Sequence, residues 1–597
     1  MLPHYHGKIN HEDIKSQSLL CLGIFVVFLS LVPSVQAIDI VHRSTELDFA
    51  RWVKSQQRPS SSHAVNTVHQ TTMLAMSDGV QLYTSIYLPS ENGQYPTILV
   101  RTPYNPTPDS YTYTGIADYY CPKGYAVVIQ TIRGKLNSEG TYSLLSSGEI
   151  DDGFDTINWI PTQTWSNGIV GIMGVSHDGF DALAAGVRNP AALKIIIAGG
   201  APADLRTDAF LVQGTVDTGL LDYIDFMTTE TGQPYDTAFY QNYLNLVRTE
   251  PRVTMHDNIV EGVQLPIWDE LVQQVSEPNS SYWTLHRIRD RFSGMQTPVV
   301  HIAGLSGDGD MPDTIQNYLT LASNPATKKL QRLILGPWAH GGSVPLGDTK
   351  NVLPYLLERI DAYLDYYLQN KSSPLLQEKP VQFYSKGEAK WIYSNDYPVS
   401  TQTETFFLSS GGKLSKDSPT NSNPSSESYS SNPTKVPSIL NMQQVRPSSD
   451  QVVYLSDPLP KAIKLTGEAT FRLFASSDVT DTDFYISFFQ RKGGAEDELV
   501  ATFVGRIDAR FRKGSYSAPS LLQKGKVYEF DVRLYPISRS VQKGTRLGIA
   551  VLSNLDPYVV RNANTGNKFG FDTEFKTAHQ RVYHSVQYPS ALTLTVH

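Results

Sequence analysis

The stretch Ile169-Val-Gly-Ile-Met-Gly-Val-Ser-His-Asp-Gly179 decides the fold of this chain. Its first half is an apolar run typical of a strand that is buried on both faces, and a segment with helical spacing follows from Phe180 to Val187. Ser176 lies two residues after Gly174 and three before Gly179. Glycines on both sides allow a sharp strand-to-helix turn that exposes a serine hydroxyl. The pattern therefore predicts a nucleophilic serine at the end of a strand.

Outward from this turn, strand-like and helix-like segments alternate. Short apolar runs occupy residues 97–100, 125–129 and 194–198, and residues 147–159 have helical spacing between them. This rhythm predicts a doubly wound parallel sheet. From residue 205 to about 296 the segments turn mainly helical, most clearly over residues 216–227 and 237–247, before strands resume at residues 298 and 333. We expect this stretch to be a helical cap inserted into the sheet domain.

The last third of the chain alternates apolar and polar residues, has turn signals and lacks long helices, which predicts an antiparallel sandwich or jelly roll. The predicted fold is thus an α/β-hydrolase sheet with an inserted helical cap, followed by an all-β jelly-roll domain. The predicted divisions are a signal peptide (1–37), the first part of the hydrolase core (38–204), the cap (205–296), the second part of the core (297–374) and the C-terminal β domain (375–597).

The N-terminus has the organisation of a signal peptide. Lys8 and Lys15 precede an uncharged apolar run over residues 19–32, and Val35-Gln-Ala37 supplies small residues at a cleavage site. An uncleaved membrane anchor is the alternative, but the run is short for a bilayer span. The sequence therefore predicts a secreted or periplasmic protein that has no membrane contact after cleavage.

Length, charge and cysteine content exclude several classes of protein. A chain of 597 residues exceeds the size of a single hydrophobic core, and a net charge of −8 without a basic cluster offers no footprint for nucleic acid. Of the two cysteines, Cys21 would leave with the signal peptide, so Cys121 is expected to be a buried structural thiol rather than a nucleophile. No metal-binding or phosphate-binding motif is found, so we predict no metal and no cofactor.

A serine nucleophile needs a base and an orienting acid, which α/β-hydrolases carry on loops after later strands in the chain order Ser, Asp, His. The strand beginning at Pro298 runs into Leu305-Ser-Gly-Asp-Gly-Asp310. The strand over residues 333–335 runs into Gly336-Pro-Trp-Ala-His340. His340 is therefore the predicted base, and the acid lies in the loop before it.

Taken together, the motifs of this chain are specific enough to indicate a resemblance to a known family. The chain resembles the family that joins X-prolyl dipeptidyl-peptidases, cocaine esterase, α-amino acid ester hydrolases and glutaryl-cephalosporin acylases. The matching motifs, besides the serine turn and the histidine motif, are Arg101-Thr-Pro-Tyr104, Ile132-Arg-Gly134 with Ser138-Glu-Gly140, Trp165-Ser-Asn-Gly168 and Arg561-Asn-Ala-Asn-Thr-Gly566.

The resemblance implies roles for two further residues. Tyr104 matches a tyrosine whose hydroxyl forms half of the oxyanion hole, and the amide of His177 forms the other half. Without the resemblance, Tyr104 reads equally as a packing residue at a strand end. His177 stands where the family has tyrosine, and its imidazole competes with His340 for the role of base. We expect His177 to contribute its backbone amide.

The acid loop departs from the family pattern. Strict spacing would place the acid at Gly307, so a shift of one residue favours Asp308 over Asp310. In α-amino acid ester hydrolases a carboxylate cluster receives the substrate's ammonium group. Asp204 lies at one of its positions, and Asp310 is a candidate for a second carboxylate, with a solvated loop residue as the alternative. Asp204 has an equally good interpretation as a helix cap.

These observations predict a secreted serine hydrolase that cleaves a small ester or amide, of the α-amino acid ester or acylase type, through an acyl-enzyme on Ser176. Two alternatives stay open: X-prolyl dipeptidyl-peptidase activity, and a non-catalytic protein that binds carbohydrate or a surface on a hydrolase scaffold. The expected partner is a small-molecule substrate, and the sequence leaves a homo-oligomer open.

Overall fold

We analysed a computed structural model, which describes residues 67–105, 111–207, 211–228, 266–340, 349–441, 444–493, 497–501, 504–514, 517–556 and 558–597. The predicted signal peptide and the helix predicted over residues 237–247 lie outside these ranges. Within them, no helix combines the length and the apolar character needed to cross a membrane.

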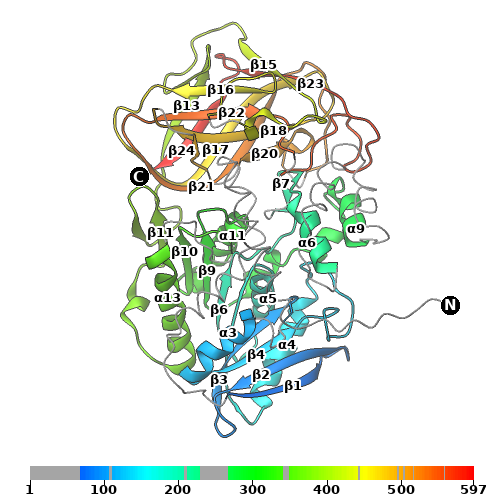
Figure 1. Cartoon of the computed structure of the whole chain (residues 1–597), viewed down its shortest axis with the longest axis vertical. Helices are drawn as coiled ribbons and strands as arrows, with labels where there is room; N and C mark the ends of the chain where they lie inside the picture. Colours follow the sequence, from blue (N-terminus) through cyan, green and yellow to red (C-terminus); the bar gives the residue numbers. More distant parts are fainter. Residues whose placement is uncertain are drawn as a thin grey trace, which may run out of the picture.

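A ten-stranded sheet organises the first part of the chain, in the order β1-β2-β4-β3-β5-β6-β9-β10-β11-β12 (Figure 1). Pairing is parallel from β4 to β11 and antiparallel at both ends of the sheet. The predicted α/β-hydrolase sheet is thereby confirmed. Its strands are β1 (Val68–Ala75), β2 (Gln81–Leu88), β3 (Tyr95–Thr102), β4 (Ala126–Thr131), β5 (Ser166–Val175), β6 (Leu193–Gly199), β9 (Val299–Gly304), β10 (Gln331–Gly336), β11 (Val381–Ser385) and β12 (Lys390–Ser394).

Helices cover both faces of this sheet because its central strands are apolar on both sides. Ile196 and Ile197, neighbours in β6, pack into different hydrophobic cores. The core that contains Ile196 includes α4 (Glu149–Trp159) and α5 (His177–Gly186). The core that contains Ile197 includes α3 (Tyr111–Tyr120) and α13 (Thr349–Gln369). The remaining helices after β9 are α11 (Met311–Ala322) and α12 (Pro325–Lys328).

The insertion between β6 and β9 contains strands as well as the predicted helices. It begins with a hairpin of β7 (Leu211–Val212) and β8 (Thr215–Val216), which the sequence analysis missed. The predicted helix from residue 216 therefore starts later, as α6 (Gly219–Thr228), because Thr215 and Val216 are in β8. In the part of the insertion that the structure describes, the further helices are α9 (Pro266–Val275), α10 (Tyr282–Leu285) and the short 3-10 helix Arg289–Gly294.

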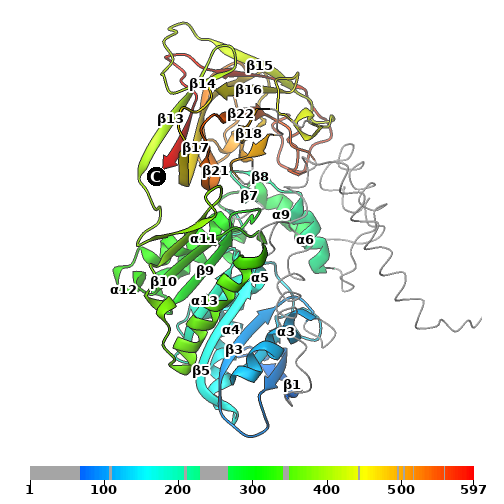
Figure 2. The same cartoon turned by 60° about the vertical axis from the view of Figure 1, so that its left-hand side comes forward.

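A twelve-stranded, mainly antiparallel sheet forms the C-terminal all-β domain, which lies above the first sheet in Figures 1 and 2. Large apolar side chains such as Phe471 and Phe488 fill its core. The strands are β13 (Gln402–Ser409), β14 (Lys413–Ser415), β15 (Ser426–Ser431), β16 (Gln451–Ser456), β17 (Ile463–Ser477), β18 (Asp483–Arg491), β19 (Glu498–Leu499), β20 (Gly505–Asp508), β21 (Tyr528–Val541), β22 (Arg546–Leu552), β23 (Ala578–Tyr583) and β24 (Ala591–Val596).

The change from the first sheet to the second falls later than the predicted residue 375. Strands β11 and β12 extend the ten-stranded sheet, and the C-terminal sheet begins at β13. The strand and turn signals of this stretch resembled those of the β domain, because a strand pattern alone does not show which sheet a strand joins. Backbone bonds between Lys386 and the β21 residues Ser538 and Ser540 then join the two sheets.

Candidate active site

Ser176 occupies a strained turn between β5 and α5. Its backbone has φ 61° and ψ −125°, outside the ordinary regions for a residue with a side chain. The Ser176 amide donates to the carbonyl of Gly199 at 2.8 Å, and its carbonyl accepts the first bond of α5, from the amide of Phe180. These bonds hold the serine at the carboxyl end of the parallel strands.

The two flanking glycines leave room for this turn. A Cβ atom on Gly174 would lie 2.2 Å from the carbonyl oxygen of Asp178, and one on Gly179 would lie 2.9 Å from Cβ of Ala201. The helix therefore folds back onto the strand so closely that neither position has space for a side chain.

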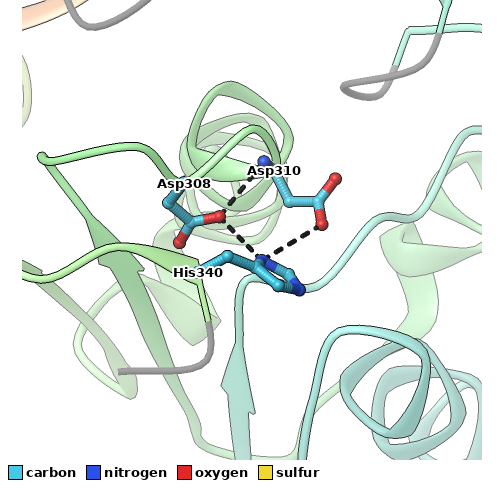
Figure 3. Close-up of side chains that lie close together, drawn as sticks. All are labelled: Asp308, Asp310 and His340. Carbon is cyan, nitrogen blue, oxygen red and sulfur yellow. Dashed lines mark hydrogen bonds and ion pairs between the residues drawn. The ribbon is translucent and has the colours of Figure 1, made fainter. Parts of the chain in front are cut away.

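His340 and Asp308 form a buried pair at the ends of β10 and β9 (Figure 3). Nδ1 of His340 lies 3.0 Å from Oδ1 of Asp308. The carboxylate is itself held by two backbone amides: Gly304 donates to Oδ2 at 2.8 Å and Asp310 donates to Oδ1 at 3.2 Å. Asp308 can thus fix both the tautomer and the orientation of the imidazole.

Gly200 connects this pair to the serine turn. It directly follows Gly199, whose carbonyl accepts the Ser176 amide. A Cβ on Gly200 would lie 2.9 Å from Nδ1 and 3.0 Å from Cε1 of His340. The imidazole thus packs on the backbone that also holds Ser176. Sequence reasoning missed Gly200, although the Gly-Gly pair at the end of β6 was a visible signal.

Asp310 lies on the same side of the imidazole as Asp308. Its Oδ2 is 3.5 Å from Nδ1 of His340, and it stands at the N-terminus of α11 (Figure 3). The shorter contact and the two amide bonds favour Asp308 as the orienting acid. Ligand atoms of Asp308, Asp310 and His340 also lie within 4.8 Å of one another, so the three side chains have the ligand types and spacing that could hold a metal ion.

Tyr104 and His177 lie together beside the serine turn, as the resemblance implied. Both are buried, and their ring centroids are 6.4 Å apart in an edge-to-face arrangement. Burial lowers the pKa of His177 to about 3, so its imidazole is neutral near pH 7. Nδ1 of His177 bonds the hydroxyl of Tyr223 at 2.6 Å. This ring therefore faces an aromatic cluster, and the histidine beside a carboxylate at 3.0 Å is His340.

Tyr223 was not singled out from the sequence. It comes from helix α6 of the insertion, and its hydroxyl lies 2.6 Å from Nδ1 of His177 and 3.4 Å from the hydroxyl of Tyr104. The periodicity of residues 216–227 predicted a helix there, but no local pattern showed which side chain would reach the sheet.

The two predicted ammonium-binding carboxylates come from different loops, that of Asp204 after β6 and that of Asp310 after β9. Asp204 is buried, and its Oδ1 accepts the amide of Arg206 at 3.1 Å. This is the bond of an Asx turn, close to the capping interpretation, although Leu205 to Thr207 form a turn rather than a helix. The other predicted carboxylate, Asp310, lies beside His340.

Two of the matching motifs contribute buried or partly buried arginines that form ion pairs. Arg101 is fully buried and pairs with Glu149 at 2.9 Å, while Arg133 pairs with Asp152 at 2.7 Å. Burial raises the pKa of Glu149 to about 7, against the opposing effect of Arg101. The same charges surround Asp181, where burial and then Glu149 raise the pKa well above its usual value. These motifs thus supply the arginines of a buried group of charged side chains next to α5.

The C-terminal motif stabilises the β domain. Asn562 donates to both Asp481 and Asp483, at 3.0 and 2.9 Å. Asp481 also pairs with the buried Arg510. This loop therefore satisfies buried carboxylates where the β domain meets the hairpin β7–β8.

Comparison with known proteins agrees with this arrangement. Residues 78–342 match the model of the X-Pro dipeptidyl-peptidase (S15 family), and residues 376–593 match the X-Pro dipeptidyl-peptidase C-terminal non-catalytic domain. Cocaine esterase from Rhodococcus sp. (strain MB1 Bresler) is 26% identical over 582 residues, covering 89% of this chain and 98% of the relative.

Two solved structures share the fold over nearly the whole chain. An aminopeptidase from a marine sediment archaeon, Thaumarchaeota archaeon, has a TM-score of 0.78 at 22% identity, over 90% of this chain and 98% of its own. An α-amino acid ester hydrolase has a TM-score of 0.78 at 24% identity, over 91% of this chain and 99% of its own.

Proposed function

The chain belongs to the S15 family of X-Pro dipeptidyl-peptidases and their esterase relatives and is a serine hydrolase, and from this premise we propose that it cleaves a small ester or amide through an acyl-enzyme on Ser176. This membership replaces the alternative of a non-catalytic binding protein. The observation that carries the proposal is the buried pair of His340 and Asp308, packed on the backbone that holds Ser176.

In the proposed reaction, His340 removes the proton from the Ser176 hydroxyl as its oxygen attacks the carbonyl carbon of the substrate. Asp308 stabilises the imidazolium that forms, because its carboxylate lies 3.0 Å from Nδ1. The hydroxyl of Tyr104 and the amide of His177 donate to the oxyanion. His340 then returns its proton to the leaving group, the acyl-enzyme remains, and the same base activates a water molecule for its hydrolysis.

For the substrate we propose an acyl group that carries a free amine. Asp310 and Asp204 are buried carboxylates on loops that follow β9 and β6, and a carboxylate in a dry site favours a cation. The family model also supports X-Pro dipeptidyl-peptidase activity, whose substrates begin with a free amine as well. We further propose that the chain is secreted after cleavage behind Ala37.

The first test is labelling with a fluorophosphonate, followed by turnover of p-nitrophenyl esters. The wild type should be labelled at Ser176 and should hydrolyse p-nitrophenyl acetate, and Ser176→Ala should lose both activities. Ser166→Ala is the matched control, because Ser166 lies ten residues earlier at the start of β5. Equal labelling of wild type and Ser176→Ala would refute the nucleophile.

The second test addresses the acyl group. Glycine-type and alanine-type p-nitrophenyl esters should be preferred over acetyl and benzoyl esters, and X-Pro p-nitroanilides would identify the peptidase alternative. Preference for the uncharged esters would contradict the carboxylate pocket while leaving the serine mechanism intact. Sequencing the N-terminus of the exported protein tests the proposed cleavage site.

A further inference from the structure

We propose that Tyr223 is a positioning residue that holds both donors of the oxyanion hole, and that the C-terminal β domain holds Tyr223 in turn through the start of helix α6. The inference rests on the proposed function, since it needs Tyr104 and His177 to supply those donors. It adds a contribution from the inserted cap, because Tyr223 lies on α6 of that cap.

The contacts of Tyr223 carry the proposal. Its hydroxyl lies 2.6 Å from Nδ1 of His177 and 3.4 Å from the hydroxyl of Tyr104. These two residues are 73 positions apart in the chain and supply the two predicted donors, one a side-chain hydroxyl and the other a backbone amide. A single oxygen atom from the cap therefore links both halves of the site.

The chemistry of an oxyanion hole assigns a direction to these bonds. The Tyr104 hydroxyl must donate its hydrogen bond to the oxyanion, so its oxygen is left to accept a hydrogen bond from the hydroxyl of Tyr223. The oxygen of Tyr223 then accepts from Nδ1–H of His177, a neutral ring because burial lowers its pKa to about 3. Hydrogen bonds aligned in this way polarise one another, which makes Tyr104 a stronger donor.

The far side of His177 is compatible with this direction. With its proton on Nδ1, Nε2 is an acceptor, and it faces Oδ1 of Asp181 at 3.9 Å. Asp181 is fully buried, and burial followed by the charge of Glu149 raises the pKa of its carboxyl well above its usual value. The shift favours the neutral acid, which is compatible with a proton on Nδ1 of His177.

The start of α6 is held by the C-terminal domain. Asp217 accepts the amide of Gly219 at 2.9 Å and pairs with Arg506 of β20 at 2.8 Å. Thr218 donates its hydroxyl to the carbonyl of Tyr558 at 2.9 Å. The helix that carries Tyr223 is therefore fixed from the β domain, one turn before the tyrosine.

The test is Tyr223→Phe, which removes the hydroxyl and keeps the ring. We expect kcat for p-nitrophenyl acetate to fall about 10-fold while KM changes little, because the oxyanion exists only in the transition state. Tyr142→Phe is the matched control: its ring centroid lies 6.2 Å from that of His177, and its buried hydroxyl has no hydrogen-bond partner among the described residues. This control should keep the wild-type kcat. A Tyr223→Phe enzyme with kcat within twofold of wild type overturns the proposal.

A double-mutant cycle separates positioning from a general packing effect. In a Tyr104→Phe background, Tyr223→Phe should cost less than it does in the wild type, because the donor on which it acts is already absent. Equal costs in both backgrounds would overturn the inference. Failure of the proposed function is recognised separately, since Ser176→Ala would then hydrolyse the ester as the wild type does.

Asp217→Asn tests the connection to the C-terminal domain. The amide oxygen of asparagine still accepts the bond of Gly219, but the ion pair with Arg506 is lost. We expect kcat to fall about 3-fold with KM unchanged, and no additional fall when Tyr223→Phe is combined with it. Wild-type kcat in Asp217→Asn would overturn this part of the proposal, whatever the result for Tyr223.

Discussion

Nδ1 of His340 lies 3.0 Å from Oδ1 of Asp308, and a second carboxylate, that of Asp310, lies 3.5 Å from the same nitrogen. The Asp308 carboxylate also accepts hydrogen bonds from two backbone amides, those of Gly304 and Asp310. We therefore expect Asp308→Asn to lower kcat/KM for p-nitrophenyl acetate by about 10³- to 10⁴-fold, since an amide at this position favours the wrong imidazole tautomer.

Asp310→Asn is the control for this assignment. With the uncharged acetyl ester it should lower kcat/KM by no more than about 10-fold, because the Asp308 pair remains. With an amino acid ester, Asp310→Asn should lower kcat/KM by a larger factor than with the acetyl ester, if Asp310 binds the ammonium group. A larger loss of kcat/KM for Asp310→Asn than for Asp308→Asn on the acetyl ester would exchange the two roles.

We expect EDTA to leave the activity of the wild type unchanged with both esters.

Gly200→Ala should remove activity while the protein stays folded. The new methyl group would lie 2.9 Å from Nδ1 of His340, so the ring has to move, and displacement of a catalytic group by about 1 Å can cost about 100-fold in rate. Gly79→Ala is the matched control, since Gly79 also has a positive φ but no atom lies within 4 Å of its added Cβ. Full activity in Gly200→Ala would show that the imidazole does not depend on this contact.

The buried imidazole of His301 should make the free energy of unfolding decrease at acidic pH. Burial lowers its pKa to about 4 in the folded state, although the hydrogen bond that Nε2–H donates to Oε1 of Gln331 opposes the effect. Between about pH 6.5 and pH 4 the unfolded chain binds a proton at this position and the folded chain does not, so the free energy of unfolding decreases as the pH falls. The slope is about 1.4 kcal/mol per pH unit.

The measurement is the melting temperature of wild type and His301→Asn across this range. The wild type should lose more of its melting temperature than the variant between pH 6.5 and pH 4.5, even if the variant is less stable at pH 7. Parallel curves for the two proteins would mean that His301 titrates alike in the folded and unfolded states.

Cys121 should react slowly with thiol reagents in the native protein. It is buried, and burial raises the pKa of its thiol to about 12, so almost no thiolate is present at pH 8. We expect alkylation by iodoacetamide, followed by mass spectrometry of the Cys121 peptide, to be at least about 100-fold faster in guanidinium chloride than in buffer. Similar rates in both conditions would contradict a structural role for this thiol.

The turn at Ser176 was predictable because its glycines and its serine lie within six residues of one another. A Cβ on Gly174 would meet Asp178, four residues later, and a short pattern records such a requirement, although Gly179 also meets Ala201 of the next loop. The strand at which the chain passes from the first sheet to the second was not predictable, for the opposite reason. Whether β11 and β12 join the first sheet or the second depends on their pairing partners, which no local pattern of strands and turns records.

The amino-acid sequence by itself determined the order of strands and helices, the serine between two glycines and the order of the serine, acid and histidine motifs. These depend on propensity and periodicity, which act over a few residues. Only the tertiary structure decided that Gly200 packs against His340 and that Tyr223 reaches Tyr104, 119 residues away. Contacts of this kind arise from the packing of whole elements, because burying their apolar faces brings together side chains that no local pattern links.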